Sequence, residues 1–373
     1  MIKWLLFFFL TFVAFGQDST KVDLDSWKKS GRKAAMEFFS TEVYGVVPAG
    51  EIRSDWKLDR ESEVLDGRVV RREYVLTLGG SLNARVLAYV PKGAKNVPAF
   101  LGLNFGGNHT VDADEWVTSG GDDKPGKAAK RWPVDMITKA GFAVLTVHCD
   151  DFDPDKDDQF QNGVHALFKE KRTNESWGTI AGWAWGLSRV LDQLKNVEEI
   201  DDTKVAVIGH SRLGKTALWA GASDERFAMV ISNNSGCGGA ALSKRRQGET
   251  VAKINTTFPH WFTGNFKQYN DKEDELPYDQ DGLIACIAPR PVYVASASKD
   301  RWADPEGEFL ALKGASVIYR LFDQQGVAGK DFPNPGETLK GTGQWYHLRE
   351  GRHEITPWDW ERYLEAALVL KKE

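Results

Sequence analysis

The residues with the clearest chemical potential lie at 209–215 and read Gly-His-Ser-Arg-Leu-Gly-Lys. The apolar run before them, at 205–208, is typical of a parallel strand buried on both faces, and residues 213–221 favour a helix. A strand, a sharp turn and a helix in this order form a nucleophile elbow, which exposes a serine hydroxyl and points backbone N–H groups at the atom it attacks. We therefore expect Ser211 to be a nucleophile.

The turn departs from the common Gly-x-Ser-x-Gly pattern, because Leu213 occupies the fifth position and the second glycine is displaced to Gly214. A Gly-x-Ser turn that merely opens a helix is the alternative interpretation. Partners for Ser211 decide between the two. A serine nucleophile needs a histidine base and a carboxylate that orients the base, and α/β-hydrolases supply them in the chain order serine, acid, histidine.

That order leaves His260, His347 and His353 as candidate bases. His353 lies in a loop just before a final helix that opens with Thr356 as N-cap and Pro357 at the first helical position. This is where such a fold carries its base, so we predict His353. His347, next to an expected strand end, stays as the alternative.

The acid is sought where a buried strand at 292–297 runs into Ser-Lys-Asp-Arg-Trp-Ala-Asp at 298–304. A carboxylate at the carboxyl end of a strand faces the crevice in which such sheets do their chemistry. Asp300 is closer to the strand end, whereas Asp304 precedes Pro305 and fits a helix N-cap better. We predict Asp300 as the catalytic acid.

The elements around these residues predict an α/β fold. From residue 133 onward helices and strands alternate, which implies right-handed crossovers and a mainly parallel sheet covered on both faces, a three-layer αβα sandwich of the α/β-hydrolase type. The expected helices are 26–39, 136–140, 179–194, 213–221 and 356–370. The expected strands are 73–78, 82–90, 98–105, 142–148, 205–208, 228–232, 291–297 and 316–322, with a glycine turn at 79–80. The segment 236–281 lacks strand periodicity; it is either a packed excursion or one wall of a substrate cleft.

Length and composition fit one exported domain. The 373 residues, 42% of them hydrophobic, can bury a full core, and no repeat or linker divides them, so we expect a single catalytic domain over 17–373. Residues 1–16 carry Lys3, an apolar run and a small-x-small end at 14–16, which is typical of a cleaved signal peptide. An uncleaved anchor is the alternative, but the run is shorter than the ~20 residues that span a bilayer. We expect a periplasmic or secreted product that begins at Gln17.

The charge and the cysteines limit the partners. A net charge of −5 offers no basic surface for nucleic acid, and no later segment is long enough for membrane insertion. The three cysteines, Cys149, Cys237 and Cys286, allow at most one disulfide and do not form a metal-ligand cluster. We expect a monomer without metal or cofactor.

Several segments together resemble the glucuronoyl esterases, carbohydrate esterase family 15. They are Gly-x-Ser-Arg-x-Gly-Lys at 209–215, Ser-Asn-Asn-Ser-Gly-Cys-Gly-Gly-Ala-Ala at 232–241, Gly-Glu-Thr-Val at 248–251, Pro-His-Trp-Phe at 259–262, Ile-Ala-Pro-Arg at 287–290, Ser-Lys-Asp-Arg-Trp at 298–302 and Arg-Glu-Gly-Arg-His at 349–353. The family cleaves the ester between the carboxyl group of (4-O-methyl)glucuronic acid on xylan and lignin alcohols, so the resemblance implies this reaction.

The resemblance also implies residue roles. Ser211 is the nucleophile, His353 the base, and Arg212 stabilises the oxyanion through its backbone N–H and its guanidinium. Three further positions, Lys215, Glu249 and Trp302, match residues that contact the hydroxyls and ring of the glucuronate.

One position departs from the fungal members. Many of them carry a catalytic glutamate after the elbow helix, where this chain has Asn234, and an asparagine cannot hold an imidazolium as a carboxylate does. Some bacterial members place the acid where Asp300 stands, which agrees with the assignment from the strand. The leading hypothesis is therefore ester hydrolysis through an acyl-enzyme. An acetyl xylan or other small-ester esterase with the same triad, and a non-catalytic carbohydrate-binding protein, are the alternatives.

Overall fold

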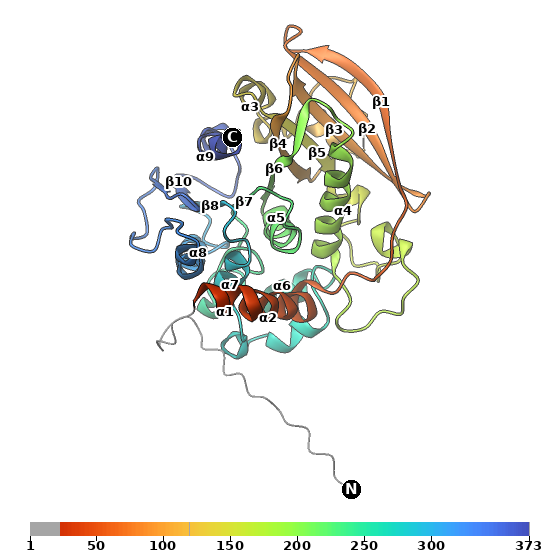
Figure 1. Cartoon of the computed structure of the whole chain (residues 1–373). Helices are drawn as coiled ribbons and strands as arrows, with labels where there is room; N and C mark the ends of the chain where they lie inside the picture. The colour runs from red at the N-terminus through yellow and green to blue at the C-terminus, as the bar shows by residue number, and fades with distance from the viewer. Residues whose placement is uncertain (1–22, 119, 373) are drawn as a thin grey trace.

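A ten-stranded sheet organises the chain in the computed structural model, which describes residues 23–118 and 120–372 (Figure 1). Its strands are β1 (Ser54–Val64), β2 (Val69–Leu78), β3 (Leu82–Pro91), β4 (Val97–Asn104), β5 (Ala143–His148), β6 (Ile200–His210), β7 (Met229–Asn233), β8 (Val292–Ala297), β9 (Thr338–Lys340) and β10 (Gln344–Arg349). The expected signal peptide at 1–16 lies outside the described residues.

The strands lie in the order β1-β2-β3-β5-β4-β6-β7-β8-β10-β9. The centre, from β5 to β10, is parallel, whereas β1, β2 and β3 form antiparallel hairpins at one end and β9 pairs antiparallel at the other. Central strands such as β7 and β8 are buried along their whole length, as a parallel sheet covered on both faces requires. The expected mainly parallel α/β-hydrolase sheet is confirmed.

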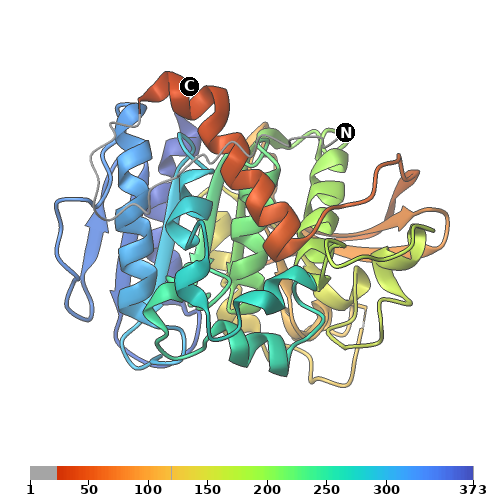
Figure 2. The ribbon, with the colours of Figure 1, turned by 90° about the horizontal axis from the view of Figure 1, so that it is seen from below.

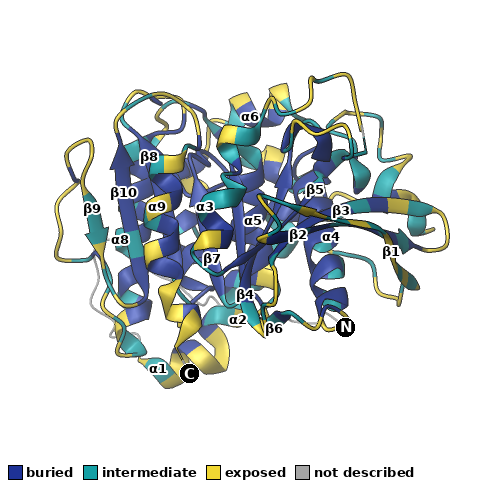
Figure 3. Cartoon of the chain, turned by 90° about the horizontal axis from the view of Figure 1, so that it is seen from above, coloured by how far each residue is buried: buried dark blue, intermediate teal, exposed yellow. Residues whose placement is uncertain are grey.

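Helices cover the sheet in two layers. They are α1 (Leu24–Ser26), α2 (Arg32–Phe38), α3 (Val134–Lys139), α4 (Thr179–Leu194), α5 (Arg212–Ser223), α6 (Val251–Thr257), α7 (Gln280–Ala285), α8 (Pro305–Leu321) and α9 (Pro357–Ala367). Side chains of α4, α5, α7 and α8 fill the core on one face, and those of α3 and α9 fill a second core on the other face. Figure 3 shows the central strands buried between the helices. The three-layer sandwich follows from these two cores.

The N-terminal helical segment, α1 and α2 with π-helical turns that continue to Tyr44, crosses the outside of the first helix layer (Figure 2). Arg32 fastens it, because its guanidinium donates to the carbonyl oxygens of Ala222, at 2.9 Å, and Cys286, at 3.0 Å. The expected helix at 26–39 is thus confirmed and is longer at both ends.

The expected strand at 316–322 is wrong, because residues up to Leu321 belong to α8. The Asp304 side chain accepts from the N–H of Gly307, and Pro305 occupies the first helical turn, so a helix begins there as the N-cap interpretation of Asp304 requires. Buried Phe309, Leu312 and Tyr319 then recur at helical spacing. A short apolar run such as 316–322 does not by itself distinguish a strand from the end of a buried helix.

Three strands, β1, β9 and β10, were missed or only partly anticipated, and β9 is only three residues long. β1 is rich in charged residues, and its alternation of exposed and half-buried positions is masked by them. β10 was expected only as a strand end near His347. The segment 236–281 contains α6 and short helical turns but no strand among its residues, as expected, and Trp261, Phe262 and Phe266 are buried in it.

Cys149, Cys237 and Cys286 are all buried free thiols, so the one disulfide that the sequence allowed does not form. Burial raises the pKa of Cys237 and of Cys286 to about 12. Between residues 23 and 372, leaving out 119, no helix combines the length and apolarity needed to cross a membrane.

Candidate active site

Ser211 stands between the end of β6 and the start of α5, in a backbone conformation with φ 59° and ψ −130°. A positive φ is costly for a serine and marks a turn that its surroundings hold in place. Here the N–H of Ser211 donates to the carbonyl oxygen of Asn233 at 2.9 Å, and the N–H of Gly214 donates to that of Ser211 at 2.8 Å. Ser211 therefore has the strained turn expected of a nucleophile elbow.

The glycines on either side allow the close approach of strand and helix. A Cβ atom on Gly209 would lie 1.8 Å from the carbonyl oxygen of Leu213, which no side chain tolerates. One on Gly214 would lie 3.0 Å from Cβ of Ser235. The displaced glycine thus lets the elbow helix pack against the loop that follows β7.

His353 and Asp300 meet across two loops, one before α9 and one after β8. Nδ1 of His353 lies 2.5 Å from Oδ2 of Asp300, and the amide of Asn234 donates to the same oxygen at 2.7 Å. Asp300 is buried, whereas the His353 side chain is 42% exposed, so Nε2 remains available to a substrate. Within the described residues Ser211 Oγ makes no hydrogen bond to His353; such contacts are commonly long in unliganded hydrolases and tighten on binding.

His347, the alternative base, lies elsewhere. It is fully buried, with Nε2 2.8 Å from Oδ1 of Asp359 and Nδ1 2.9 Å from the hydroxyl of Tyr293. Burial lowers its pKa. Because both ring nitrogens are engaged inside the core, His347 has none left for Ser211.

His210, the residue before the nucleophile, packs its ring against that of His353 with a centroid distance of 4.6 Å. Its Nδ1 lies 2.6 Å from the side-chain oxygen of Asn233. Burial, and next the charge of His353, hold the pKa of His210 well below its ordinary value. A neutral His210 places no second full charge beside the base.

Arg212 is held by a carboxylate that the sequence analysis did not single out. Its Nε lies 2.7 Å from Oδ2 of Asp155, and the guanidinium carbon lies 4.7 Å from the ring centre of Phe105. The other oxygen of Asp155 contacts Nε2 of His260 at 3.0 Å and accepts from the indole of Trp261 at 2.7 Å.

Burial raises the pKa of Asp155, but its contacts with His260 and Arg212 outweigh this and lower it overall. The carboxylate is therefore charged and orients Arg212. His260 was expected only as one of three candidate bases, and residues 259–262 only as part of the family resemblance and of a possible cleft wall; the histidine and tryptophan were the available signal for this cluster.

The three residues matched to sugar contacts form one chain of contacts. Nζ of Lys215 donates to the carbonyl oxygens of Ser235 and Cys237, both at 2.6 Å, and to Oε2 of Glu249 at 3.1 Å. The backbone N–H of Glu249 donates to the carbonyl oxygen of Trp302 at 2.9 Å. Since an ammonium has three donors, Lys215 is saturated by the protein and fixes Glu249.

Trp302 is the exposed member, with 54% of its surface accessible, and Lys253 lies over its ring at 5.2 Å. Among the exposed large apolar side chains of the described residues, Trp302 has the largest accessible fraction. An exposed indole beside a buried Glu249 provides an apolar face and a polar acceptor together, as a sugar requires.

Glu308, on α8, holds the loop that follows β7, whose carbonyl oxygens at Ser235 and Cys237 accept from Lys215. Its carboxylate accepts from the backbone N–H groups of Ser235, at 2.6 Å, and Gly236, at 3.0 Å, and from the hydroxyl of Ser296, at 2.6 Å. Burial raises its pKa to about 7. Sequence reasoning missed it because nothing in a helical glutamate distinguishes a buried support from a solvated charge.

One group of side chains near β5 has the composition of a metal site. Potential ligand atoms of His148, Cys149 and Asp150 all lie within 4.8 Å of one another. However, Nε2 of His148 contacts the carbonyl oxygen of Phe105 at 3.1 Å, and the Cys149 thiol donates to Asp150 at 3.4 Å. Burial raises the pKa of Cys149 well above its ordinary value, which opposes the thiolate that a metal would need. These residues are engaged with one another and fit a metal poorly.

Comparison with known proteins agrees with this geometry. The family model of glucuronyl esterases of fungi matches residues 127–323, just over half of the chain. A carbohydrate esterase from an unknown prokaryotic organism is 45% identical over 376 aligned residues, which cover 94% of this chain and 87% of the relative.

Solved structures are similar over nearly the whole length. A glucuronoyl esterase from Solibacter usitatus has 38% identity and a TM-score of 0.89, covering 94% of this chain and 95% of its own. An esterase of carbohydrate esterase family 15, described as promiscuous and taken from a marine bacterial metagenome, has 43% identity and a TM-score of 0.86, covering 93% of this chain and 92% of its own.

Proposed function

Because the chain belongs to the glucuronoyl esterases, carbohydrate esterase family 15, we propose that it hydrolyses the ester between the carboxyl group of (4-O-methyl)glucuronic acid and an alcohol, as in xylan joined to lignin. The observation that carries the proposal is the contact of 2.5 Å between His353 and the buried Asp300, beside a strained elbow serine. These are the parts that serine esterases use.

The reaction proceeds through an acyl-enzyme. Ser211 Oγ attacks the ester carbonyl while Nε2 of His353 takes its proton, and Asp300 stabilises the imidazolium. The oxygen that becomes negative faces the backbone N–H and the guanidinium of Arg212. His353 returns the proton to the departing alcohol, and a water molecule then releases the glucuronate by the same steps in reverse.

Sugar recognition uses Trp302, Glu249 and Lys215. The exposed indole packs on the sugar ring, and Glu249, oriented by Lys215, accepts from sugar hydroxyls. Lys215 contributes its own donor only by exchanging one of its contacts with the carbonyl oxygens of Ser235 and Cys237.

Replacement of the nucleophile tests the reaction. The Ser211→Ala variant is expected to lose turnover of methyl and benzyl glucuronate by on the order of 10⁴-fold or more. Retained turnover would overturn the proposal. Esters of galacturonate, which differ in one hydroxyl configuration, are expected to react more slowly if Glu249 reads the sugar hydroxyls.

A broader ester specificity, including acetylated xylan, is the second candidate, because a relative with 43% identity is described as promiscuous. Rates on acetyl and glucuronate esters compared side by side decide between them. A much larger kcat/KM for the glucuronate ester favours the first candidate, and comparable values favour the second.

We also propose that the protein is exported and acts as a monomer without a metal or cofactor. The apolar segment at 1–16 supports export. Sequencing the N-terminus of the mature protein tests this, and Gln17 is expected there. Light scattering tests the oligomeric state, and full activity after dialysis against a chelator is expected.

A further inference from the structure

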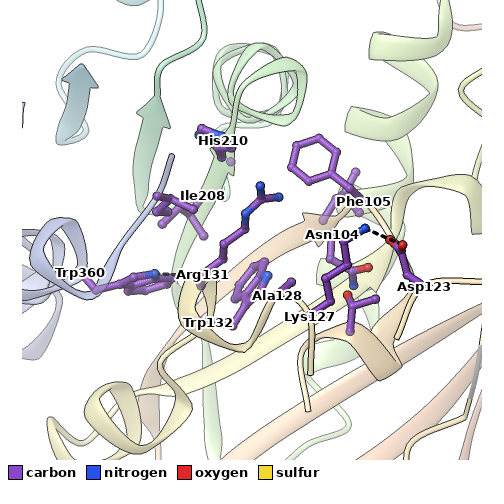
Figure 4. A pocket seen from close by; sticks show the side chains of 15 residues that line it. Asn104, Phe105, Asp123, Lys127, Ala128, Arg131, Trp132, Ile208, His210 and Trp360 are labelled. Carbon is purple, nitrogen blue, oxygen red and sulfur yellow. Dashed lines mark hydrogen bonds and ion pairs between the residues drawn. The ribbon is translucent and has the colours of Figure 1, made fainter. Parts of the chain in front are cut away.

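A cavity of about 230 Å³ lies beside the elbow, at the ends of β4 and β6 (Figure 4). In the sheet β4 lies on one side of β6, whereas β7 and β8, whose following loops carry Glu249 and Trp302, lie on the other. The cavity is thus separate from the sugar-contacting residues. Its walls are mainly aromatic and aliphatic, with Phe105, Trp132, Ile208, Ile355 and Trp360 among them.

The cavity adjoins the catalytic base. Gly209 and His210, which line it, directly precede Ser211, and Ile355 follows His353 closely in the chain. The ring of His210 packs on that of His353 at 4.6 Å. Since the proposed base His353 protonates the departing oxygen, the alcohol of the ester begins beside His353, and an alcohol that continues across the ring of His210 reaches the cavity.

Arg131 gives the cavity a polar feature. Its guanidinium points into the space between His210 and Phe105 (Figure 4). Within residues 23–118 and 120–372 no carboxylate pairs with its guanidinium, which lies 5.6 Å from the ring centre of Phe105. The other cation on the wall, Lys127, is already paired with Asp123 at 2.6 Å. The indole of Trp360 donates to the carbonyl oxygen of Arg131 at 2.8 Å and anchors its backbone.

We propose that this cavity binds the aromatic ring of the ester's alcohol, with Arg131 donating to an oxygen substituent on that ring. A cavity of ~150 Å³ with apolar walls is large enough for benzene, so this one accommodates a single substituted ring. Aromatic walls stack on the ring, and an arginine without a carboxylate partner both packs on a ring face and donates to a methoxy or phenolic oxygen. This inference rests on the proposed glucuronoyl esterase activity and names the alcohol that the activity prefers.

A cavity-filling variant tests the proposal with two esters of glucuronic acid, methyl and benzyl, whose alcohols have nearly the same acidity. The wild type is expected to favour the benzyl ester in kcat/KM by roughly 10- to 100-fold, the range for burying one apolar ring. Ala128 lines the cavity, and Ala128→Trp is expected to bring the benzyl-to-methyl ratio close to one. An equal ratio in the wild type, or a ratio unaltered by Ala128→Trp, overturns the proposal.

A second variant covers the case in which Ala128→Trp fails to fold. Arg131→Met keeps the stem and removes the donor, and it is expected to abolish a roughly 3- to 10-fold preference of the wild type for 4-methoxybenzyl over benzyl glucuronate. Lys130→Met, an exposed neighbour that does not line the cavity, should leave that preference as it is. An Arg131→Met variant that keeps the preference contradicts the role of Arg131.

The outcomes separate the two proposals. If the wild type hydrolyses neither glucuronate ester, the proposed function fails, and this inference fails with it. If the wild type hydrolyses both esters without preference for the aromatic alcohol, the function stands and only the cavity proposal fails.

Discussion

Two histidines that are six residues apart in the chain, His347 and His353, each contact an aspartate, but the two pairs differ in burial and in their further contacts. His353 contacts Asp300 through Nδ1 alone, and its side chain is 42% exposed. His347 contacts Asp359 through Nε2 and Tyr293 through Nδ1, and it is completely buried. The same two residue types therefore form the proposed base and its acid in one place and a purely structural contact in the other. The difference lies in whether one ring nitrogen is left free and accessible.

The partners of the two aspartates reinforce this difference. Asp300 accepts from the amide of Asn234 through the same oxygen that contacts Nδ1 of His353. Asp359 accepts from Thr356 at the start of α9 and from Arg349 on β10, so it ties a helix cap to a strand. One carboxylate contacts the proposed base, and the other connects a helix cap to a strand.

The largest expected effect is on kcat, which should fall strongly when His353 is replaced and little when His347 is replaced. His353→Ala is expected to reduce kcat on benzyl glucuronate by on the order of 10⁴-fold, because the general base is lost. His347→Gln, measured per folded molecule, should stay within a few-fold of the wild type. Steady-state kinetics on both variants checks this, and a comparable loss in His347→Gln would break the comparison.

The next prediction concerns the acid. Asp300→Asn is expected to lower kcat by on the order of 10³- to 10⁴-fold, because an amide does not stabilise the imidazolium. Asn234→Ala removes only a donor to Asp300 and is expected to cost less than about 10-fold. A larger loss for Asn234→Ala than for Asp300→Asn would reverse the assignment of the acid.

The order of the two histidines should be reversed when the free energy of unfolding is measured in place of activity: replacing His347 should cost more than replacing His353. His347→Ala is expected to lower the free energy of unfolding by about 2–4 kcal/mol, since it leaves a cavity and a buried Tyr293 hydroxyl without its partner and removes one of the contacts of the buried Asp359. His353→Ala, at an exposed position, is expected to change it by less than about 0.5 kcal/mol. Urea unfolding of the two variants provides the measurement.

The smallest effect is a pH dependence of stability. Burial lowers the pKa of His347 in the folded protein, so the unfolded chain takes up its proton first as the pH falls below about 6.5. The stability from neutral His347 is therefore present above that pH and lost below it, by up to ~1.4 kcal/mol per pH unit. The His347→Gln variant should lack this loss when the free energy of unfolding is measured from denaturation curves at pH 7.5 and at pH 5.5.

The difference between wild type and His347→Gln is the quantity to compare, because other groups titrate as well. Glu308, whose pKa burial raises to about 7, changes stability in the opposite direction, losing its contribution as the pH rises. An identical pH slope in wild type and His347→Gln would mean that His347 is not the neutral, buried group of this structure.

The elements that position the nucleophile and the acid were predictable because their signals are local. A buried strand, a glycine, a serine and a helix former specify the elbow within a few residues, and Pro305 after Asp304 indicated the helix cap and left Asp300 as the candidate acid. Local signals failed at residues 316–322, where an apolar run belongs to a helix, and at β1, where charged side chains conceal a strand.

The contacts that hold Arg212 and Lys215 in place could not be predicted from the residues next to them in the chain. Asp155 and His260 are separated by 105 residues, yet they meet around Arg212. Lys215 was expected to bind sugar directly, and the structure shows that its donors are already used. No spacing rule reports which of many charged residues end up facing one another.

By itself the sequence determined the elbow, the order of the candidate triad and the family, because each depends on residues near one another in the chain. Only the tertiary structure decided which histidine keeps a free nitrogen, which carboxylate holds Arg212 and where a cavity opens beside the base. These depend on burial and on distances between segments far apart in the chain. The packing of β4, β6, β8 and α9 sets those distances, and no single segment contains them.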